Sequence, residues 1–239
     1  MALDHALRDL AEQDGSTVIR LYRWSTSTVS FGANESATRH WNRGALEHAG
    51  VPVVRRPSGG RAVWHDQDDL TYAYTGPLAT FGAQQSAYHA IHECLAAALT
   101  RVGLDATLAP APARLPGLRR GACFDVAVGG EVVVGEIKVI GSAQVVTRRA
   151  LLQHGAIARA TRPARLDRFR IDASPDEHAA AAVPVMPILP SAEDVSAAIV
   201  QEWLDRGARM VDPELTARAN LASVQHLARY RDPLWTWRR

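Results

Sequence analysis

Residues 51 to 76 read VPVVRRPSGGRAVWHDQDDLTYAYTG. β-Branched and aromatic residues flank the Ser-Gly-Gly at 58–60, and a polar, Asp-containing stretch separates them from a third such run at 70–74. This pattern predicts a strand, a glycine-rich turn, a second strand, another turn and a third strand. Strands so closely spaced predict a sheet at the centre of the fold, with helices from elsewhere in the chain packed against it.

The residues before and after this stretch add strands and helices. Alternating apolar and polar residues at 17–24 and 28–33 predict a strand pair. Apolar residues at helical spacing predict helices over 2–12, over about 35–48 and over 84–102, where Gly103 provides a stop signal.

A second β-rich region follows these helices. Residues 122–146 predict a strand, a Gly-Gly hairpin turn and two further strands, and residues 148–158 predict one more strand. The Pro-, Gly- and Arg-rich residues 106–121 between the two β-rich regions predict a loop.

The C-terminal region is predicted to be helical. Ser191 with Asp194 starts a helix over 192–207, and Asp212 before a proline starts a last helix over about 213–230. The resulting order predicts an α+β fold with a mixed, largely antiparallel sheet and packed helices. We expect a single domain over residues 1–239 that includes the C-terminal helices of 191–239.

Composition excludes several classes of protein. With 239 residues, 47% of them hydrophobic, the chain can bury a sizeable core, and its net charge of +2 gives no global field for nucleic acid or a membrane. Neither a secretory signal nor a long apolar run is present in the sequence. Two cysteines are too few for a disulfide scaffold, which favours a reducing compartment and therefore the cytoplasm.

The first candidate site is the segment RRPSGGRAVWHD at 55–66. Its glycines let the backbone approach a ligand, and its backbone N–H groups and polar side chains could hold an anion or a polar acyl or nucleotide head group. The spacing is not that of a P-loop. A surface turn with solvated arginines is the alternative. The candidate binding residues are Arg56, Ser58, Gly59, Gly60, Arg61 and His65.

The second candidate site surrounds Lys138, which is the only lysine among 27 basic residues. An ammonium group is a compact charge that can contact a carbonyl oxygen in a narrow space and stabilise an oxyanion. Small residues follow it, and His154 could orient a group or accept a proton, or else be an ordinary core histidine. The small residues are Gly141, Ser142 and Ala143.

Cys123 is a candidate nucleophile. It follows a basic stretch, and nearby cationic groups lower the pKa of a thiol and so favour the reactive thiolate. A buried cysteine that only fills space is the alternative. Cys94 lies in the middle of a predicted helix, where we expect it to pack.

Taken together and in order, these motifs resemble a known family. RRPSGGRAVWHDQDDLTY (55–72), ACF (122–124), KVIGSAQ (138–144) and LLQHGAI (151–157) resemble the lipoate–protein ligase A and octanoyltransferase family, relatives of the biotin ligases. MALDHAL resembles its opening helix. The resemblance implies a biotin/lipoyl ligase-like fold that holds an acyl chain in a tunnel, with the 55–66 loop lining the tunnel and Lys138 touching the acyl carbonyl.

The resemblance is closer to one branch of that family. Its ATP-dependent ligases carry an Asn-Asp pair before the lysine hairpin, whereas this chain has Cys123-Phe124 fifteen residues before Lys138. That placement, together with Arg61 in place of a third glycine, resembles the cysteine-dependent octanoyltransferases.

The implied reaction is a two-step acyl transfer in lipoic acid biosynthesis, without cofactor or metal. Cys123 would take the octanoyl group from octanoyl-acyl carrier protein and pass it to a lysine of a lipoyl domain or of glycine cleavage H protein. Lys138 would polarise the carbonyl, and either His65 or His154 would handle protons. Three alternatives stay open: an ATP-dependent lipoate ligase, an amidotransferase between lipoyl-bearing proteins, and a non-catalytic acyl-binding protein.

Overall fold

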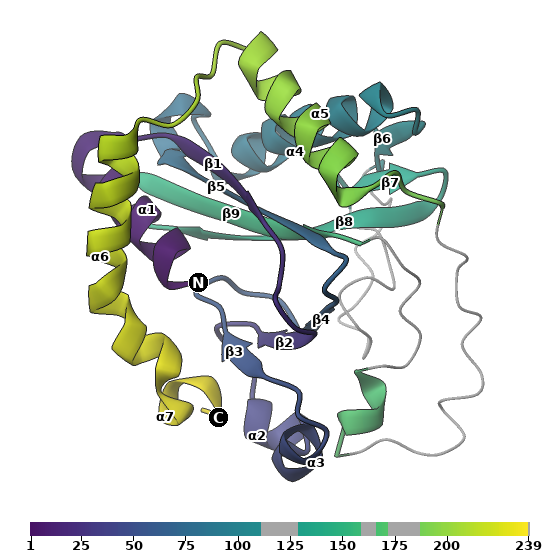
Figure 1. The fold of residues 1–239 in the computed structure, drawn as a ribbon, viewed down its shortest axis with the longest axis vertical. Helices are drawn as coiled ribbons and strands as arrows, with labels where there is room; N and C mark the ends of the chain where they lie inside the picture. Colours follow the sequence, from purple (N-terminus) through teal and green to yellow (C-terminus); the bar gives the residue numbers. More distant parts are fainter. Residues whose placement is uncertain (111–128, 159–165, 172–186, 239) are drawn as a thin grey trace.

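The computed structural model describes residues 1–110, 129–158, 166–171 and 187–238. A six-stranded sheet with the order β1-β5-β9-β8-β7-β6 crosses the centre, and a three-stranded sheet with the order β3-β2-β4 lies below it in Figure 1. Among the described strands, every neighbouring pair is antiparallel except β2 and β3. The strands are β1 (Val18–Tyr22), β2 (Thr28–Phe31), β3 (Val53–Arg55), β4 (Val63–His65), β5 (Leu70–Pro77), β6 (Ala106–Leu108), β7 (Val132–Val134), β8 (Ile137–Val146) and β9 (Ala150–Ile157).

Helices lie on both sides of the large sheet. α4 (Gln84–Arg101) and α5 (Ala192–Asp205) cover one side, whereas α1 (Ala2–Asp14), with α6 (Pro213–Arg231) against it, lies on the other (Figure 1). Three short helices and two 3₁₀ turns complete the described elements: α2 (Ala37–His40), α3 (Arg43–His48), α7 (Pro233–Thr236), η1 (Leu78–Thr80) and η2 (Asp167–Phe169). The predicted α+β class with a largely antiparallel sheet is confirmed, and a second, smaller sheet accompanies the large one.

Several local sequence signals are confirmed. The three strands predicted within residues 51–76 form as β3, β4 and β5. The predicted N-caps of the last two long helices are present, because Ser191 Oγ accepts from the backbone N–H of Asp194 at 3.0 Å and Asp212 Oδ1 accepts from that of Glu214 at 2.7 Å.

The prediction of a strand pair at 17–24 and 28–33 was wrong. Both strands form, but β1 pairs with β5 in the large sheet, whereas β2 pairs with β3 and β4 in the small one. The reason is burial: all four residues of β2 are buried, and Val29 and Phe31 pack in a second core with Trp41 and Trp64.

Two other predictions need correction. Residues 106–108 were predicted as loop, but they form the edge strand β6, whose Thr107 lies opposite Val133. The helix predicted over 35–48 is split into α2 and α3, since Trp41 is extended and turns its ring into the second core, and Asn42 caps the helix that follows.

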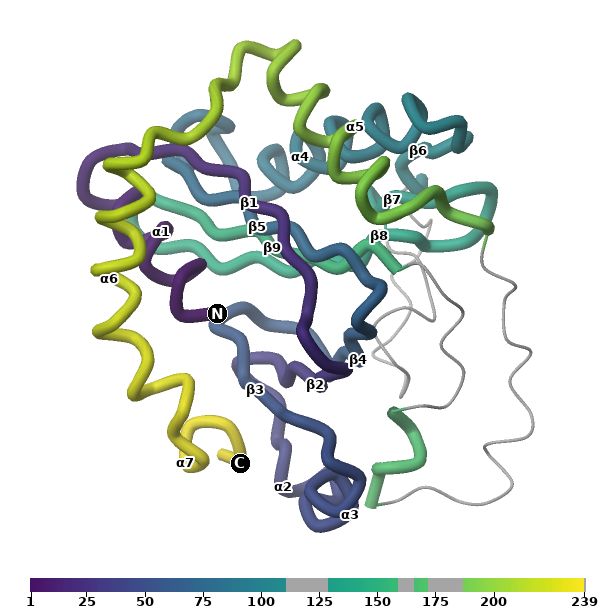
Figure 2. Tube along the Cα trace, in the orientation of Figure 1, coloured from purple at the N-terminus to yellow at the C-terminus, as the bar shows by residue number. Residues whose placement is uncertain are grey.

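The C-terminal end returns to the small sheet. Figure 2 shows α7 near β3, far from it in sequence. The fully buried Arg55 holds this end in place, because its guanidinium donates to the carbonyls of Trp235, Thr236 and Arg238 and also to those of the 32–35 turn. None of the described helices combines the length and apolar character needed to cross a bilayer.

Candidate active site

A β-bulge determines which face of the large sheet carries Lys138. Val132 lies opposite Ile140, but the next residue of β7, Val133, lies opposite Lys138, so β8 contains one extra residue at this point. Residues directly opposite each other share a face, and neighbours along a strand alternate. Val132 and Ile140 pack in the core under α4. Lys138 therefore lies on the opposite face.

His154 lies on that same face. Its neighbours at odd positions of β9, Leu151 and Ile157, pack under α4, so the even-numbered His154 points the other way. Between Lys138 and His154 on this face the strands present Gly141, Ala143 and Ala156, which are all small. Small side chains beside a buried cation are what an apolar acyl chain with a polar carbonyl end requires.

Lys138 is buried against a carboxylate. Its Nζ lies 2.6 Å from Glu131 Oε1, and the two side chains are only 6% and 7% exposed. A buried ammonium is tolerated when it is paired in this way. Glu131 was missed from the sequence. The turn that brings it near Lys138 joins β7 to β8 at residues 135–136 and is separate from the predicted Gly-Gly turn at 129–130.

The glycine-rich loop, residues 56–62, is held rigidly by its own arginine. Buried Arg56 donates to the carbonyls of Gly59, Arg61 and Ser30, so its guanidinium supports the loop from inside. The loop also lies against Gly32, where a Cβ atom would come within 1.8 Å of the Gly60 carbonyl oxygen. Gly60 itself has φ of 90°, which favours glycine.

A hydrogen bond joins this loop to the large sheet. Ser58 Oγ lies 2.5 Å from His154 Nε2, and both side chains are buried. Burial lowers the pKa of His154 to about 4, although Asp4 opposes the shift, so the imidazole is neutral at pH 7. Among the described residues, His154 Nδ1 has no hydrogen-bond partner. The predicted residues Ser58 and His154 are thus brought together.

His65 occupies a different place. It lies on β4 in the small sheet, where its Nε2 is 2.8 Å from Ser30 Oγ and its ring stacks on Trp24 at 4.7 Å. Arg61 is half-buried beside the loop glycines. His65 and His154 therefore lie on separate sheets. The glycine-rich loop joins β3 to β4 in the small sheet and reaches the large sheet through the bond between Ser58 and His154.

Ser142 points away from this face. Its Oγ lies 2.7 Å from His92 Nε2 and 2.6 Å from the Tyr72 hydroxyl, under α4. His92 Nδ1 is 2.6 Å from the Gly130 carbonyl, which can only accept, so Nδ1 carries the proton and Nε2 accepts from Ser142. Gln153 Nε2 donates to the Tyr72 hydroxyl at 2.8 Å.

This hydrogen-bond network supports the segment that carries Glu131. It runs from Gln153 through Tyr72, Ser142 and His92 to Gly130, the residue next to Glu131. Burial, with Lys138 contributing, lowers the pKa of His92 to about 4, which keeps this ring neutral. Of the predicted trio Gly141, Ser142 and Ala143, only Gly141 and Ala143 belong to the Lys138 face. Nothing in the sequence indicated the network, because its members come from four separate elements.

Cys123 lies outside the described residues, so its position relative to Lys138 stays a prediction. Cys94 lies on α4 and is half-buried, as expected for a packing residue. Burial raises the pKa of its thiol, which disfavours the thiolate.

Solved structures of lipoate ligases share this fold. A lipoate-protein ligase A bound with ATP superposes with a TM-score of 0.75 at 19% identity, covering 99% of this chain and 92% of that one. A putative lipoate protein ligase from T. acidophilum with bound lipoic acid gives a TM-score of 0.74 at 20% identity, covering the same shares. At such identities the similarity concerns the fold alone.

Sequence relatives are closer. The chain is 34% identical to the octanoyltransferase LipM of Kyrpidia tusciae, with 100% of this chain and 94% of the relative covered. It is 30% identical to that of an Exiguobacterium species, with 100% and 93% covered. The model of the lipoyl protein ligase A/B catalytic domain matches residues 1–202. The chain, with its glycine-rich loop and its buried lysine, therefore belongs to the lipoyl protein ligase A/B catalytic-domain family.

Proposed function

We propose that this chain is an octanoyltransferase that moves an octanoyl group from acyl carrier protein to a lysine of a lipoyl domain or of glycine cleavage H protein. The observation that carries the proposal is the 34% identity, over the whole chain, to a relative named octanoyltransferase. The buried Lys138 supports it, since a transferase needs a fixed cation where negative charge develops on the acyl oxygen.

The proposed reaction has two steps. The Cys123 thiolate attacks the carbonyl carbon of the octanoyl thioester, and the bond to the carrier sulfur breaks, so that the carrier thiolate leaves and takes up a proton. The amine of the acceptor lysine then attacks the Cys123 thioester and forms an amide, which releases the Cys123 thiolate and one proton. In both steps the Lys138 ammonium donates to the oxygen that becomes negative.

Glu131 has a positioning role in this scheme. An ammonium group has three donors, so Lys138 can keep its bond to Glu131 while it donates to an acyl oxygen. Because the pair is buried, the carboxylate holds the long side chain in one direction. Arginine in place of Lys138 would present a planar fork of donors and would not reproduce a single-point contact.

Of the two candidate histidines, His154 suits a structural role. A general base works best when its pKa is near the operating pH, and burial holds the pKa of His154 at about 4. Its bond to Ser58 instead fastens the glycine-rich loop over the Lys138 face. We further propose a cytoplasmic location, on the cysteine content of the sequence.

The decisive experiment is to mix the protein with octanoyl-acyl carrier protein, without ATP, and record its intact mass. We expect one octanoyl adduct that hydroxylamine removes, because a thioester is cleaved and an amide is not. Cys123→Ser should lack the adduct, and the matched variant Cys94→Ser, which alters the chain's other cysteine, should keep it. An adduct that persists in Cys123→Ser would refute the covalent scheme.

Two further mixtures test the alternatives. With ATP and free octanoate or lipoate, release of AMP would mean that the chain is a ligase. With an octanoylated or lipoylated protein as the donor and a second lipoyl domain as the acceptor, faster transfer than from the acyl carrier protein would mean that it is an amidotransferase. The sequence holds one lysine, so acylation of the chain's own amines is limited to Lys138 and the N-terminus, and peptide mapping separates these from Cys123.

A further inference from the structure

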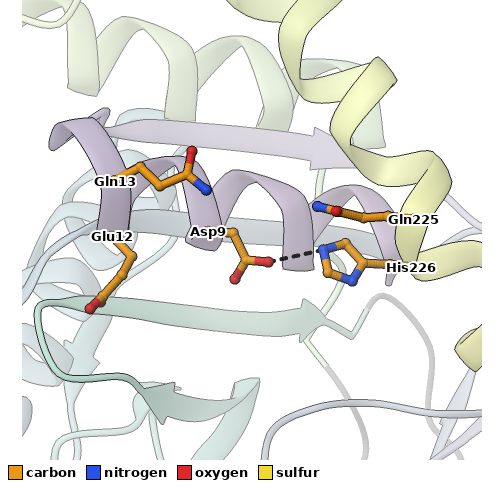
Figure 3. A pocket seen from close by; sticks show the side chains of 5 residues that line it. All are labelled: Asp9, Glu12, Gln13, Gln225 and His226. Carbon is orange, nitrogen blue, oxygen red and sulfur yellow. Dashed lines mark ion pairs between the residues drawn. The ribbon is translucent and has the colours of Figure 1, made fainter.

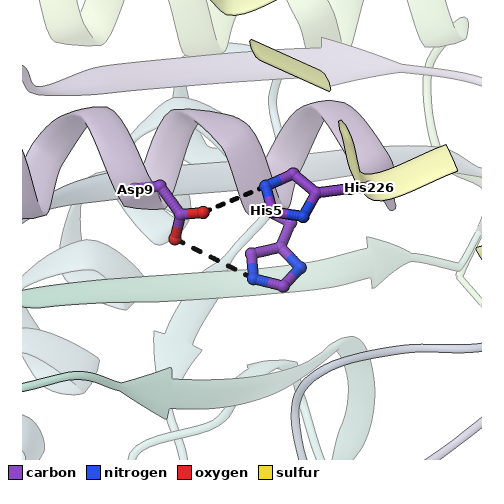
Figure 4. Close-up of side chains that lie close together, drawn as sticks. All are labelled: His5, Asp9 and His226. Atoms are coloured by element: carbon purple, nitrogen blue, oxygen red, sulfur yellow. Dashed lines mark ion pairs between the residues drawn. The ribbon is translucent and has the colours of Figure 1, made fainter. Parts of the chain in front are cut away.

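Two histidines and an aspartate meet between α1 and α6. His5 and Asp9 are one turn apart on α1, and His226 comes from α6 (Figure 4). His226 Nε2 lies 3.0 Å from Asp9 Oδ2, and His5 Nε2 lies 3.8 Å from Asp9 Oδ1. The imidazole rings are stacked, with centroids 3.9 Å apart and planes inclined by 8°.

These distances suit a small divalent transition-metal ion. Zinc–nitrogen bonds of ~2.0–2.1 Å in tetrahedral geometry place ligand atoms roughly 3.3–3.4 Å apart. His226 Nε2 lies 3.0 Å from Asp9 Oδ2, close to that value, and one ligand atom from each of the three residues lies within 4.8 Å of the other two, so His5 must move closer when an ion binds. Because the two ring planes are stacked and nearly parallel, one ion cannot lie in the plane of both rings, so binding requires one imidazole to turn about its Cβ–Cγ bond. His226 lines a surface cavity, and we expect its ring to be the one that turns.

The surroundings of His5 orient it as a ligand. Its Nδ1 is 3.1 Å from the Tyr230 hydroxyl, which leaves Nε2 directed at Asp9. Metal-bound histidines are held by such a partner on the second ring nitrogen. Arg8 donates to Asp9 Oδ1 at 2.8 Å, which leaves Oδ2 as the oxygen for an ion.

The cluster opens to solvent on one side. Asp9 and His226 line a cavity of about 420 Å³ together with Glu12, Gln13 and Gln225 (Figure 3). Glu12 is occupied elsewhere, since its Oε2 accepts from the backbone N–H groups of residues 149 and 150. An ion on His5, Asp9 and His226 would therefore have three protein ligands and a fourth position open to water.

An ion at this place would matter for α6. Of the 19 residues of that helix, only Ala219 is buried, and the apolar cluster that joins it to α1 is small. We propose that His5, Asp9 and His226 form a binding site for a divalent transition-metal ion of the zinc class, which fastens α6 to α1. This site is independent of the proposed acyl transfer.

The test is thermal unfolding of the full chain, first stripped with a chelator, with and without added Zn²⁺. An ion that binds only the folded state, at a free concentration 100 times its Kd, should raise the Tm by about 5–10 °C. His226→Gln and Asp9→Asn should lose this rise, and His48→Gln, which alters an exposed histidine on α3, should keep it. Tyr230→Phe should weaken binding by roughly 10-fold or more.

Far-UV circular dichroism of each variant in chelator shows whether it is folded before zinc is added. If a variant is unfolded, Co²⁺ provides a second measurement on the wild-type protein, since four-coordinate Co²⁺ has strong visible absorption that zinc should abolish by displacement. No rise in the Tm of the wild type, or an equal rise in His226→Gln, would overturn the proposal.

Discussion

Replacing Lys138 by Met separates the structural role of this residue from its chemical role. The change removes the ammonium 2.6 Å from Glu131, whose carboxylate is 7% exposed. Removing one partner of a buried ion pair costs about 3–5 kcal/mol. For a chain of this size, that loss lowers the Tm by roughly 6–20 °C. The exposed pair Arg43–Glu47 is the matched control, and Arg43→Met should cost less than about 1 kcal/mol.

The double variant Lys138→Met/Glu131→Met completes the design. It replaces both charges with apolar side chains of similar length, which for a buried pair is often neutral or even stabilising. We therefore expect it to recover most of the lost free energy of unfolding. Octanoyl transfer should stay abolished in both variants, because the proposed role of Lys138 requires its ammonium.

Urea unfolding followed by circular dichroism measures the stabilities, and intact mass with octanoyl-acyl carrier protein measures transfer, under conditions where every variant is folded. If Lys138→Met is within 1 kcal/mol of the wild type, the buried pair does not have the assigned energetic role. If the double variant transfers octanoate at the wild-type rate, the assignment of Lys138 to the acyl oxygen is refuted.

Three other predictions concern the sheet and its supports. Gly155→Ala should lower stability by about 1–3 kcal/mol, because its Cβ would lie 2.5 Å from the Gly141 carbonyl oxygen. Gly44→Ala is the control: no atom lies closer than 3.7 Å to its Cβ, so the Tm should stay unchanged or rise. Because the pKa of His154 is lowered to about 4 on folding, the unfolded chain binds the extra proton, and this residue alone should contribute roughly 2 kcal/mol to the loss of stability between pH 7.5 and pH 5. A His154→Gln variant should therefore show a loss that is smaller by about that amount in urea titrations at the two pH values. Arg55→Met should speed amide exchange in α7, since it removes the donors that bind this end of the chain; unchanged exchange by mass spectrometry would contradict that role.

Much of the candidate site could be predicted from the sequence because it depends on residue type. A lone lysine in an arginine-rich chain indicates a position where the shape of the cation matters. The Ser-Gly-Gly turn between two strands predicts a backbone that approaches other groups closely, and Gly32 and Gly60 meet in that way. The helix caps at Ser191 and Asp212 could also be predicted, since each capping hydrogen bond joins residues only two or three apart in the sequence.

What the sequence alone determined about this protein is most of its local elements, its fold class and the residue types at the site. Only the tertiary structure decided that β1 and β2 enter different sheets, that a bulge turns Lys138 onto the face of His154, and that Glu131 is its partner. The physical reason is that a period-2 pattern assigns a residue to one of two faces but does not identify the strand beside it, and one inserted residue reverses the assignment. The contact between His5 and His226 was also decided by the tertiary structure, because α1 and α6 lie near opposite ends of the chain and a helical pattern does not identify the helix beside it.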